Sequence, residues 1–336
     1  MIFHKVLTAV EIERGSVKIL EVEKKKNGYL LNNFLNNTIA GAEPREISIE
    51  LNNIFLKNKI RRKNVYTNIK DNSVWTYHLL LPEMPENDLI KAVEYEIKKK
   101  LPFPVSSATF DYIYTYSLNP DTSKNIKITV FVTKKEDIDL LNAIFTNSGI
   151  KLKSIECKTT SIFNAYLYVH GNRKGHYLLC DINSSVARIM IIYDNSTSFE
   201  RILEDPAIAE HAINKLGNII GSEIKKTVDF YYAGKSIEPI ENIYLSGIYS
   251  YAPEFIKNVS SIAELPVKTD GIINLMNRGL TSGVAGKMPF IPSGKKLLNN
   301  NHNDDYDNNT LLLSEIDEQF IPLTDMWTTF GLIANR

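Results

Sequence analysis

The sequence predicts an α/β protein of two related lobes, with a small α+β module inserted between two β-hairpin units. The first observation is a pattern that occurs twice, at Glu11 to Leu20 (EIERGSVKIL) and at Asp181 to Met190 (DINSSVARIM). Each copy follows an apolar run, opens with an acid, turns through small or polar residues, and enters a second strand that carries a base. The second observation is that both halves of the chain give three strands, then helix, then strand.

The first lobe begins with three predicted strands between residues 5 and 36. The dipeptide Asn27-Gly28 separates the second strand from the third, and it is typical of a tight type I′ hairpin turn. A helix is predicted near Ile47 to Leu56, where apolar residues recur at the spacing of one helical face. A strand at Asn64 to Ile69 completes this unit.

The segment between the hairpin units, residues 74–153, predicts a small α+β subdomain. An apolar strand at 74–81 precedes a helix within Pro82 to Pro104, whose apolar residues are spaced four apart. Acids in its first turn and lysines in its last turn complement the helix dipole, and the closing prolines stop it. Paired strands at 110–116 and 126–133 and a helix at 135–148, capped by Gly149, complete the order.

The second lobe repeats the layout of the first. Three strands are predicted between residues 177 and 203, with a turn at Asp194 to Ser196. Two helices, near 206–217 and 222–233, are expected to follow. A strand at 241–245 then ends in Ser246-Gly247, and a closing helix is predicted at Met326 to Ala334.

These elements predict three domains. The first lobe comprises residues 1–73 together with 154–175, the inserted subdomain comprises 74–153, and the second lobe comprises 176–336. Residues 287–325 are expected to form a mobile surface loop. Its Asn-rich run at 299–309 buries too little apolar surface to offset an ordering cost of roughly 1–2 kcal/mol per residue.

The composition is that of a globular protein with a full core. Of 336 residues, 43% are hydrophobic and 23% are charged, and a formal net charge of +0 gives no field that favours nucleic acid. Cys157 and Cys180 are too few for a disulfide framework and fit a reducing cytoplasm. The six histidines show no metal-ligand spacing, and no apolar run is long enough to span a membrane.

The paired hairpins point to phosphate chemistry. A tight strand-turn-strand hairpin directs backbone N–H groups outward from its tip, so two hairpins across a cleft clamp a polyphosphate while the leading acid holds Mg2+ through water. Actin, sugar kinases and Hsp70 chaperones bind ATP in this way. Any two β-hairpins with Gly or Ser in the turn would also align over ten residues, and the pattern alone leaves both interpretations open.

Several segments resemble one family. Residues 81–112 (LPEMPENDLIKAVEYEIKKKLPFPVSSATFDY) are similar to a segment of the PilM family, the actin-like cytoplasmic proteins of type IV pilus assembly, including its P-F-P ending. The stretches Glu223 to Tyr231 (EIKKTVDFY), Ile243 to Gly247 (IYLSG) and Phe330 to Ala334 (FGLIA) resemble further segments of that family in the same order. The resemblance covers almost the whole chain except residues 287–325.

The resemblance implies an actin-like (ribonuclease H-like) two-lobe fold, in which the insert replaces one actin subdomain as it does in FtsA. It also implies a cytoplasmic scaffold, peripheral to the inner membrane, that binds the N-terminal cytoplasmic tail of a PilN-like protein and contacts pilus or secretion motor components. Leu101, Pro102, Phe103 and Pro104 are candidates to line a groove for this tail. Alternatively, Phe103 only fixes the helix end to the core. Self-association stays open, and no nucleic acid is expected.

The resemblance also gives candidate contacts to ATP with Mg2+. These are Glu11, Arg14, Gly15, Ser16 and Lys18 in the first hairpin, Asp181, Asn183, Ser184 and Ser185 in the second, and Glu223, Lys226 and Gly247 beyond them.

The chain departs from the family in each nucleotide segment. Glu11 replaces an Asp and Glu13-Arg14 replaces Gly-Ser, which brings extra carboxylate beside a polyphosphate. Asn183 replaces a Gly, a mild change because Asn tolerates a left-handed backbone, and a hydroxyl is lost at Ala187. Two bulky residues, Ile248 and Tyr249, follow Gly247, where the family has glycines that let the backbone pass close to the adenosine.

These departures predict a degenerate member, without catalytic residues, that binds ATP weakly or not at all and works as an adaptor. The opposing hypothesis is an active actin-type ATP-binding protein whose nucleotide state switches partner binding or polymerisation. Glu11, Glu13 and Asp181 are then the acids available to orient the attacking water. A sugar kinase of the same fold and a secretion-system relative that lacks ATP binding are further alternatives.

Overall fold

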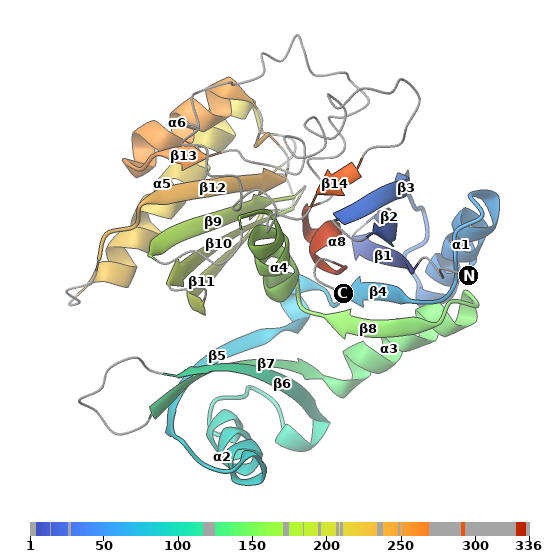
Figure 1. The fold of residues 1–336 in the computed structure, drawn as a ribbon, viewed down its shortest axis with the longest axis horizontal. Helices are drawn as coiled ribbons and strands as arrows, with labels where there is room; N and C mark the ends of the chain where they lie inside the picture. Colours follow the sequence, from blue (N-terminus) through green and yellow to red (C-terminus); the bar gives the residue numbers. More distant parts are fainter. Residues whose placement is uncertain are drawn as a thin grey trace. The chain divides into compact units, whose positions relative to one another are not determined.

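Figure 1 shows the fold as a computed structural model. It describes residues 5–13, 15–25, 28–116, 125–170, 175–183, 185–193, 196–205, 208, 211–233, 238–247, 249–250, 252–268, 290–292 and 327–333. The chain divides into two compact units. The first unit comprises residues 1–9, 18–36 and 161–336, and the second comprises 10–17 and 37–160. The predicted boundaries of the lobes and the insert stay a prediction.

A six-stranded sheet with the order β14-β3-β2-β1-β4-β8 contains the first predicted hairpin. The three strands predicted at the start of the chain are confirmed, and so is the strand after the first helix. The strands are β1 (Val6–Glu13), β2 (Ser16–Lys25), β3 (Gly28–Thr38), β4 (Val65–Asn68), β8 (Leu152–Glu156) and β14 (Phe290–Pro292). All of β1 except its last residue is buried, which explains its apolar sequence VLTAVEIE and makes its acids unusual.

Helix α1 (Pro44–Lys57) confirms the first predicted helix, and it buries Ile47, Leu51 and Phe55. The Glu46 side chain caps the start of this helix by accepting a hydrogen bond from the Glu43 backbone N–H at 3.3 Å. A single 3-10 turn, η1 (Asp71–Ser73), separates β4 from the insert.

The insert forms the predicted α+β subdomain around a three-stranded sheet of order β5-β7-β6. Its elements are β5 (Trp75–Pro82), α2 (Glu86–Lys98), η2 (Val105–Ser107), β6 (Ala108–Tyr116), β7 (Asn125–Lys134) and α3 (Lys135–Asn147). Helix α2 lies across the sheet in Figure 1 and packs Leu89, Val93 and Ile97 against Ile128 and Val130. The four-residue apolar spacing of this helix therefore predicted its buried face.

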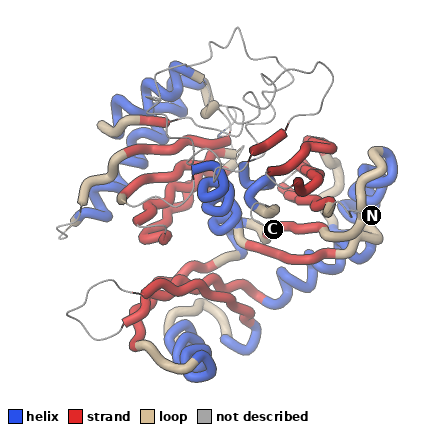
Figure 2. Tube along the Cα trace, in the orientation of Figure 1, coloured by secondary structure: helices blue, strands red, loops and turns tan. Residues whose placement is uncertain are grey.

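A second sheet, of order β11-β10-β9-β12-β13, contains the second hairpin. Its strands are β9 (His176–Ile182), β10 (Val186–Tyr193), β11 (Ser196–Glu204), β12 (Asn242–Gly247) and β13 (Val267–Lys268). The remaining helices are α4 (Lys158–His170), α5 (Ile213–Tyr232), α6 (Pro253–Ala263) and α8 (Trp327–Gly331). Helices α5 and α6 lie side by side in Figure 2, and they pack with β9, β10 and β12 in one hydrophobic core.

Two helices were predicted after the second hairpin, and this prediction was wrong for the residues that the structure describes. One helix, α5, runs through the expected break, and the start expected at 206–217 lies partly outside the described residues. Gly217 and Gly221 lie inside α5 because α6 passes close to it. A Cβ at Gly217 would lie 2.9 Å from the Asn258 Cβ, and one at Gly221 would lie 3.0 Å from the Ile262 Cβ.

The prediction of a loop at 287–325 was wrong at its described residues, which form strand β14. Residues 290–292 pair with β3 as an antiparallel strand. The rest of 287–325, like the turn residues Asn27, Asp194 and Asn195, lies outside the described residues. The predicted closing helix is confirmed as α8, and the Tyr29 hydroxyl donates to the Ile333 carbonyl at 3.1 Å. No helix in the described ranges has the length and apolar character needed to cross a membrane.

The two thiols are expected to differ in reactivity. Cys180 is fully buried in β9, and burial raises the pKa of its thiol, with a smaller contribution from the charge of Asp181. Cys157 is partly exposed. Ellman's reagent at pH 8 should therefore label one thiol in the native protein and two in guanidinium. Rapid labelling of both thiols in the native protein would contradict this.

The raised pKa of Cys180 also sets a pH dependence. The folded value lies above the unfolded value of about 8.5, so the unfolded chain loses this proton first as the pH rises. The stabilisation is complete below about pH 8.5 and decreases at higher pH. Tyr168 acts in the same direction, because burial raises the pKa of its hydroxyl as well. Urea midpoints measured between pH 7 and 10 should therefore fall toward the alkaline end.

Candidate functional site

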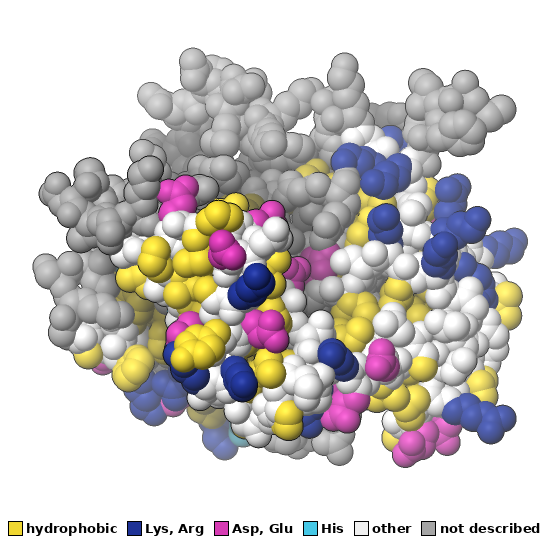
Figure 3. Space-filling model, turned by 90° about the horizontal axis from the view of Figure 1, so that it is seen from below, with side chains coloured by type: hydrophobic (Ala, Val, Ile, Leu, Met, Phe, Trp, Pro, Cys, Tyr) yellow, Lys and Arg dark blue, Asp and Glu magenta, His cyan; other side chains and the backbone are white. Residues whose placement is uncertain are grey.

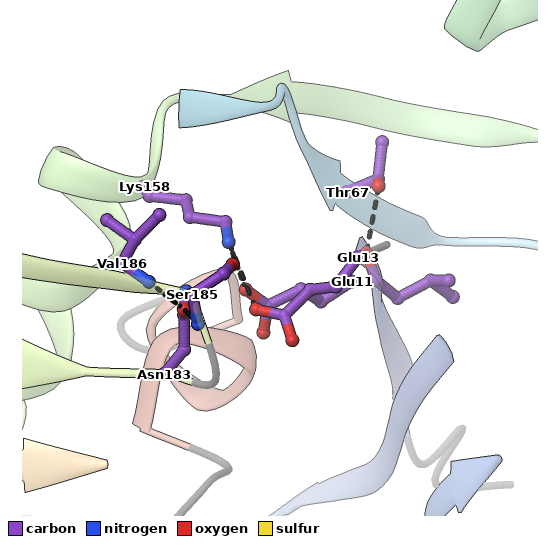
Figure 4. A network of polar contacts seen from close by, with 8 residues as sticks. Glu11, Glu13, Thr67, Lys158, Asn183, Ser185 and Val186 are labelled. Carbon is purple, nitrogen blue, oxygen red and sulfur yellow. Dashed lines mark hydrogen bonds and ion pairs between the residues drawn. The ribbon is translucent and has the colours of Figure 1, made fainter. Parts of the chain in front are cut away.

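The tip of the first hairpin holds a buried cluster of three charges, shown in Figure 4. The Lys158 Nζ lies 2.9 Å from Glu11 Oε1 and 3.2 Å from Glu13 Oε1. The side chains of Lys158, Glu11 and Glu13 are 8%, 2% and 10% exposed. The negative charge of a buried carboxylate requires a nearby positive charge. The leading acid of the hairpin was predicted to hold Mg2+ through water, and here the lysine supplies the positive charge.

Strand geometry explains why the two glutamates meet one lysine. Glu11 and Glu13 are two residues apart on β1, and alternate residues of a strand point to the same face. The neighbouring strand β4 is fixed to β1 by the Thr67 hydroxyl, which donates to the Val10 carbonyl at 2.8 Å. The chain then returns through β8, which pairs with β4, and enters α4 at Lys158.

The other described residues of the first hairpin that were predicted to contact ATP lie in its turn and along β2. Gly15 forms the turn with a φ of 76°, and its carbonyl accepts from the Ile39 N–H at 2.9 Å. Ser16 is half-buried at the start of β2, and Lys18 is buried further along that strand. Arg14 lies outside the described residues.

The tip of the second hairpin is closed by the side chain of Asn183. Its Oδ1 accepts hydrogen bonds from the Ser185 N–H at 2.9 Å and from the Val186 N–H at 2.7 Å. Backbone N–H groups at such a tip are the groups that would bind phosphate. Here two of them are already bonded within the hairpin. Ser184 lies outside the described residues.

The role of Asn183 differs from the one expected from the sequence. Asn was expected to suit a left-handed backbone at this turn, but the φ of Asn183 is not positive. Its carboxamide instead makes a side-chain turn with the next two described N–H groups. The replacement of Gly by Asn is therefore more than a mild change.

The leading acid of the second hairpin is also bonded within its own unit. Asp181 is buried, and its Oδ1 accepts a hydrogen bond from the Ser246 hydroxyl at 2.5 Å. Strands β9 and β12 pair in parallel with Asp181 opposite Ser246, so the sheet register brings the two side chains together. In the sequence, Ser246 stands out only as the residue that ends a predicted strand.

Gly247 was expected to let the backbone pass close to adenosine, but in the structure it lets two strands approach each other. Its φ is 83°, and a Cβ at this position would fall on the carbonyl oxygen of Ile182 and lie 2.8 Å from the Ile182 carbonyl carbon. The close neighbour of this glycine is therefore strand β9. Tyr249 has a φ of 61° and packs its ring 6.3 Å from that of Phe255, toward the core. Ile248 lies outside the described residues.

The remaining predicted charges make ion pairs. The base of the second hairpin, Arg188, forms a buried ion pair with Glu200 on β11. Glu223 is held between two cations, with its Oε2 at 2.5 Å from Arg201 Nη2 and its Oε1 at 2.6 Å from Lys226 Nζ. The structure thus brings Glu223 and Lys226 together on one face of α5, where residues three apart are neighbours.

The predicted partner segment divides into packed and exposed residues. Leu101 and Phe103 are half-buried and pack against the core of the insert. The Phe103 ring centre lies 4.8 Å from that of Trp75, and the Lys134 Nζ lies 5.8 Å from the Phe103 ring centre. Pro102 and Pro104 are exposed. Phe103 therefore fixes the end of α2 to the core, and the prolines are left on the surface.

Sequence reasoning missed Lys158. Its local signal was weak: a lysine in the first turn of a helix opposes the helix dipole, which is unusual without a nearby anion. The anions lie far away in the sequence, on β1. Only the order β1-β4-β8 in the sheet brings them together.

The described residues do not fit a bound MgATP. The carboxylates of the first hairpin already share an ammonium, and two N–H groups of the second hairpin are bonded to Asn183. The hydroxyl expected opposite phosphate is missing at Ala187, which is buried. Each hairpin has therefore satisfied, within its own unit, groups that would otherwise bind the cation or the phosphates.

This chain is similar to several solved structures. A PilM-PilN type IV pilus biogenesis complex is similar with a TM-score of 0.65 and 17% identity, covering 78% of this chain and 87% of that chain. The cytoplasmic domain of EpsL, an inner membrane component of the type II secretion system of Vibrio cholerae, has a TM-score of 0.45 and 9% identity, with coverages of 77% and 95%. The ethanolamine utilization protein EutJ from Carboxydothermus hydrogenoformans has a TM-score of 0.43 and 10% identity, with coverages of 78% and 84%.

The similarity to the PilM-PilN complex confirms the predicted actin-like α/β fold. Among curated protein sequences, none matches this chain. The family described as type IV pilus assembly protein PilM matches residues 9–204, which is more than half of the 336 residues. The chain therefore belongs to the PilM family of type IV pilus assembly proteins.

Proposed function

We propose that this protein is a cytoplasmic adaptor of type IV pilus assembly, or of a related secretion machinery, that works without bound MgATP. It holds the cytoplasmic tail of a PilN-like inner-membrane protein and lies peripheral to the membrane through that partner. The observation that carries the proposal is the family match over residues 9–204, which includes both hairpins and the whole insert. That a similar solved structure is a complex of PilM with PilN supports a PilN-like partner here.

Independence from MgATP is supported by the internal contacts of the two hairpins. A nucleotide would have to compete with Lys158 for Glu11 and with Asn183 for the N–H groups of Ser185 and Val186. Extra carboxylate beside a triphosphate is repulsive. The adaptor hypothesis needs no catalytic residue, and the contacts of Glu11, Glu13 and Asp181 leave each of these acids engaged in the fold.

The insert supplies the surface that we propose for the tail. Pro102 and Pro104 are exposed beside the packed Phe103–Trp75 ring pair. Figure 3, seen from below Figure 1, shows hydrophobic side chains gathered among charged ones where the insert faces the viewer. The large apolar side chains exposed on the insert are Leu80, Ile90, Tyr95, Ile113, Tyr114 and Leu140. An extended tail with alternating apolar side chains would fit such a surface.

Thermal unfolding tests both halves of the proposal. A synthetic peptide of the N-terminal tail of the PilN-like partner, at a hundred times its dissociation constant, is expected to add about 2.7 kcal/mol and raise the midpoint by several degrees. MgATP at millimolar concentration is expected to cause no shift. A shift with MgATP that is lost in Asp181→Ala would instead support the switchable ATP-binding protein.

A matched pair of variants locates the peptide. Pro102→Asp places a charge on the proposed surface and should weaken peptide binding about tenfold or more, a loss of about 1.4 kcal/mol. Leu56→Asp changes a side chain that is 61% exposed on α1, outside the insert, and should leave peptide affinity unchanged. Isothermal titration calorimetry measures both. Equal affinities in the two variants would remove the prolines from the proposed surface.

A further inference from the structure

We infer that Lys158 is a built-in counter-ion that replaces a divalent cation at the paired carboxylates of Glu11 and Glu13. The inference deepens the proposed independence from MgATP and rests on that half of the proposed function. It is carried by one juxtaposition: a single ammonium lies 2.9 Å and 3.2 Å from two carboxylate oxygens of the same strand, and all three side chains are at most 10% exposed.

The carboxylate pair has the chemistry of a divalent-cation site. Carboxylate oxygens are the ligands that Mg2+, Mn2+ and Ca2+ prefer, and alternate positions on β1 present both groups to one face. A divalent cation and an ammonium compete for the same oxygens. The ammonium is covalently attached to the chain at α4, so it is present at the site at any cation concentration.

The surrounding sheet holds the lysine at this place. Strand β4 pairs with β8 at Asn68 and Glu156, immediately before α4 begins. The Thr67 hydroxyl ties β4 to the Val10 carbonyl at 2.8 Å, next to the first glutamate. The position of the ammonium is thus set by three adjacent strands. Loss of the lysine charge would remove the ammonium that both buried carboxylates contact and would favour a divalent cation in its place.

The test is to remove the charge and supply a metal. Lys158→Met keeps an unbranched side chain without the ammonium. With MnCl2 at 2 mM, electron paramagnetic resonance of free Mn2+ is expected to show about one bound ion per chain in Lys158→Met and none in the wild-type protein. The unfolding midpoint of the variant should rise by several degrees with MnCl2, relative to NaCl at the same ionic strength. The wild-type midpoint should not change.

Two control variants separate this site from general cation binding. Lys158→Met combined with Glu13→Gln has one carboxylate fewer and should lose the bound Mn2+. Lys99→Met removes another lysine that pairs with a glutamate, but at the surface, where its Nζ lies 2.7 Å from Glu96 Oε1 and its side chain is 49% exposed. This variant should bind no Mn2+.

The Mn2+ measurements test the role of Lys158 without the PilN-like peptide. Mn2+ binding by Lys158→Met, or folding of this variant only when Mn2+ is present, supports it. A Lys158→Met protein that neither binds more Mn2+ than wild type nor folds better with it overturns the inference, and leaves Lys158 as an ordinary ion-pair residue. Such a failure leaves the peptide-induced shift of the wild-type protein untouched, whereas loss of that shift would overturn the proposed function itself.

Discussion

Replacing Gly247 with alanine is expected to destabilise the fold by more than about 3 kcal/mol, because strain and overlap add at this position. The φ of 83° is unfavourable for a residue with a side chain. The new Cβ would also meet the backbone of β9 at Ile182, which has no flexible atoms to move aside. Urea unfolding monitored by circular dichroism should show a strongly reduced midpoint or no native baseline.

Gly15 provides the matched control for this substitution. Its φ is 76°, close to that of Gly247, but the nearest atom to an added Cβ is the Ile39 carbonyl oxygen at 4.0 Å. Gly15→Ala therefore tests the backbone conformation alone and should cost about 1–2 kcal/mol. If the two variants lose the same stability, the close approach of β12 to β9 is not what requires Gly247.

The second large effect is expected from Arg188→Met. Arg188 and Glu200 form an ion pair whose side chains are 5% and 6% exposed, between the adjacent strands β10 and β11. Removing the guanidinium breaks the buried ion pair and leaves the Glu200 charge in place, which typically costs about 3–5 kcal/mol. Urea unfolding at pH 7 measures the loss.

The double variant Arg188→Met, Glu200→Leu tests the cause. Replacing both charges by apolar side chains also removes the buried negative charge, so most of the lost stability should return. Lys99→Met, which breaks an exposed pair with Glu96, should leave the urea midpoint almost unchanged. A double variant as unstable as Arg188→Met would show that packing of the arginine chain, rather than charge, is responsible.

Local patterns predicted most of the fold because the forces that fix those elements are local. Helix α2 was predicted from the spacing of Leu89, Val93 and Ile97, which is also the face that it buries. Helix α5 was wrongly predicted as two helices, one ending at Gly217 and the next beginning at Ser222. The reason for that glycine is the close approach of α6, and single-chain propensity carries no information about a neighbouring helix.

The candidate site was less predictable than the fold. Its acids were found because each opens a recognisable hairpin, and the departures at Glu11 and Asn183 were visible in the sequence. What those departures do depends on partners far away in the chain. Lys158 reaches Glu11 only through the sheet order, and the bonds made by Asn183 depend on the conformation of the turn. The residue types alone predicted neither the contact of Lys158 with Glu11 nor the hydrogen bonds of Asn183.

The close packing of α5 and α6 has a consequence for how the sequence can change. At Gly221, an added Cβ would lie 3.0 Å from the Ile262 Cβ, and at Gly217 it would lie 2.9 Å from the Asn258 Cβ. Because the contact is with a Cβ atom, a larger residue on α5 is acceptable only together with glycine at the facing position of α6. These two pairs should vary together among homologues, and a library that randomises both helices should recover the exchange of small for large across each pair.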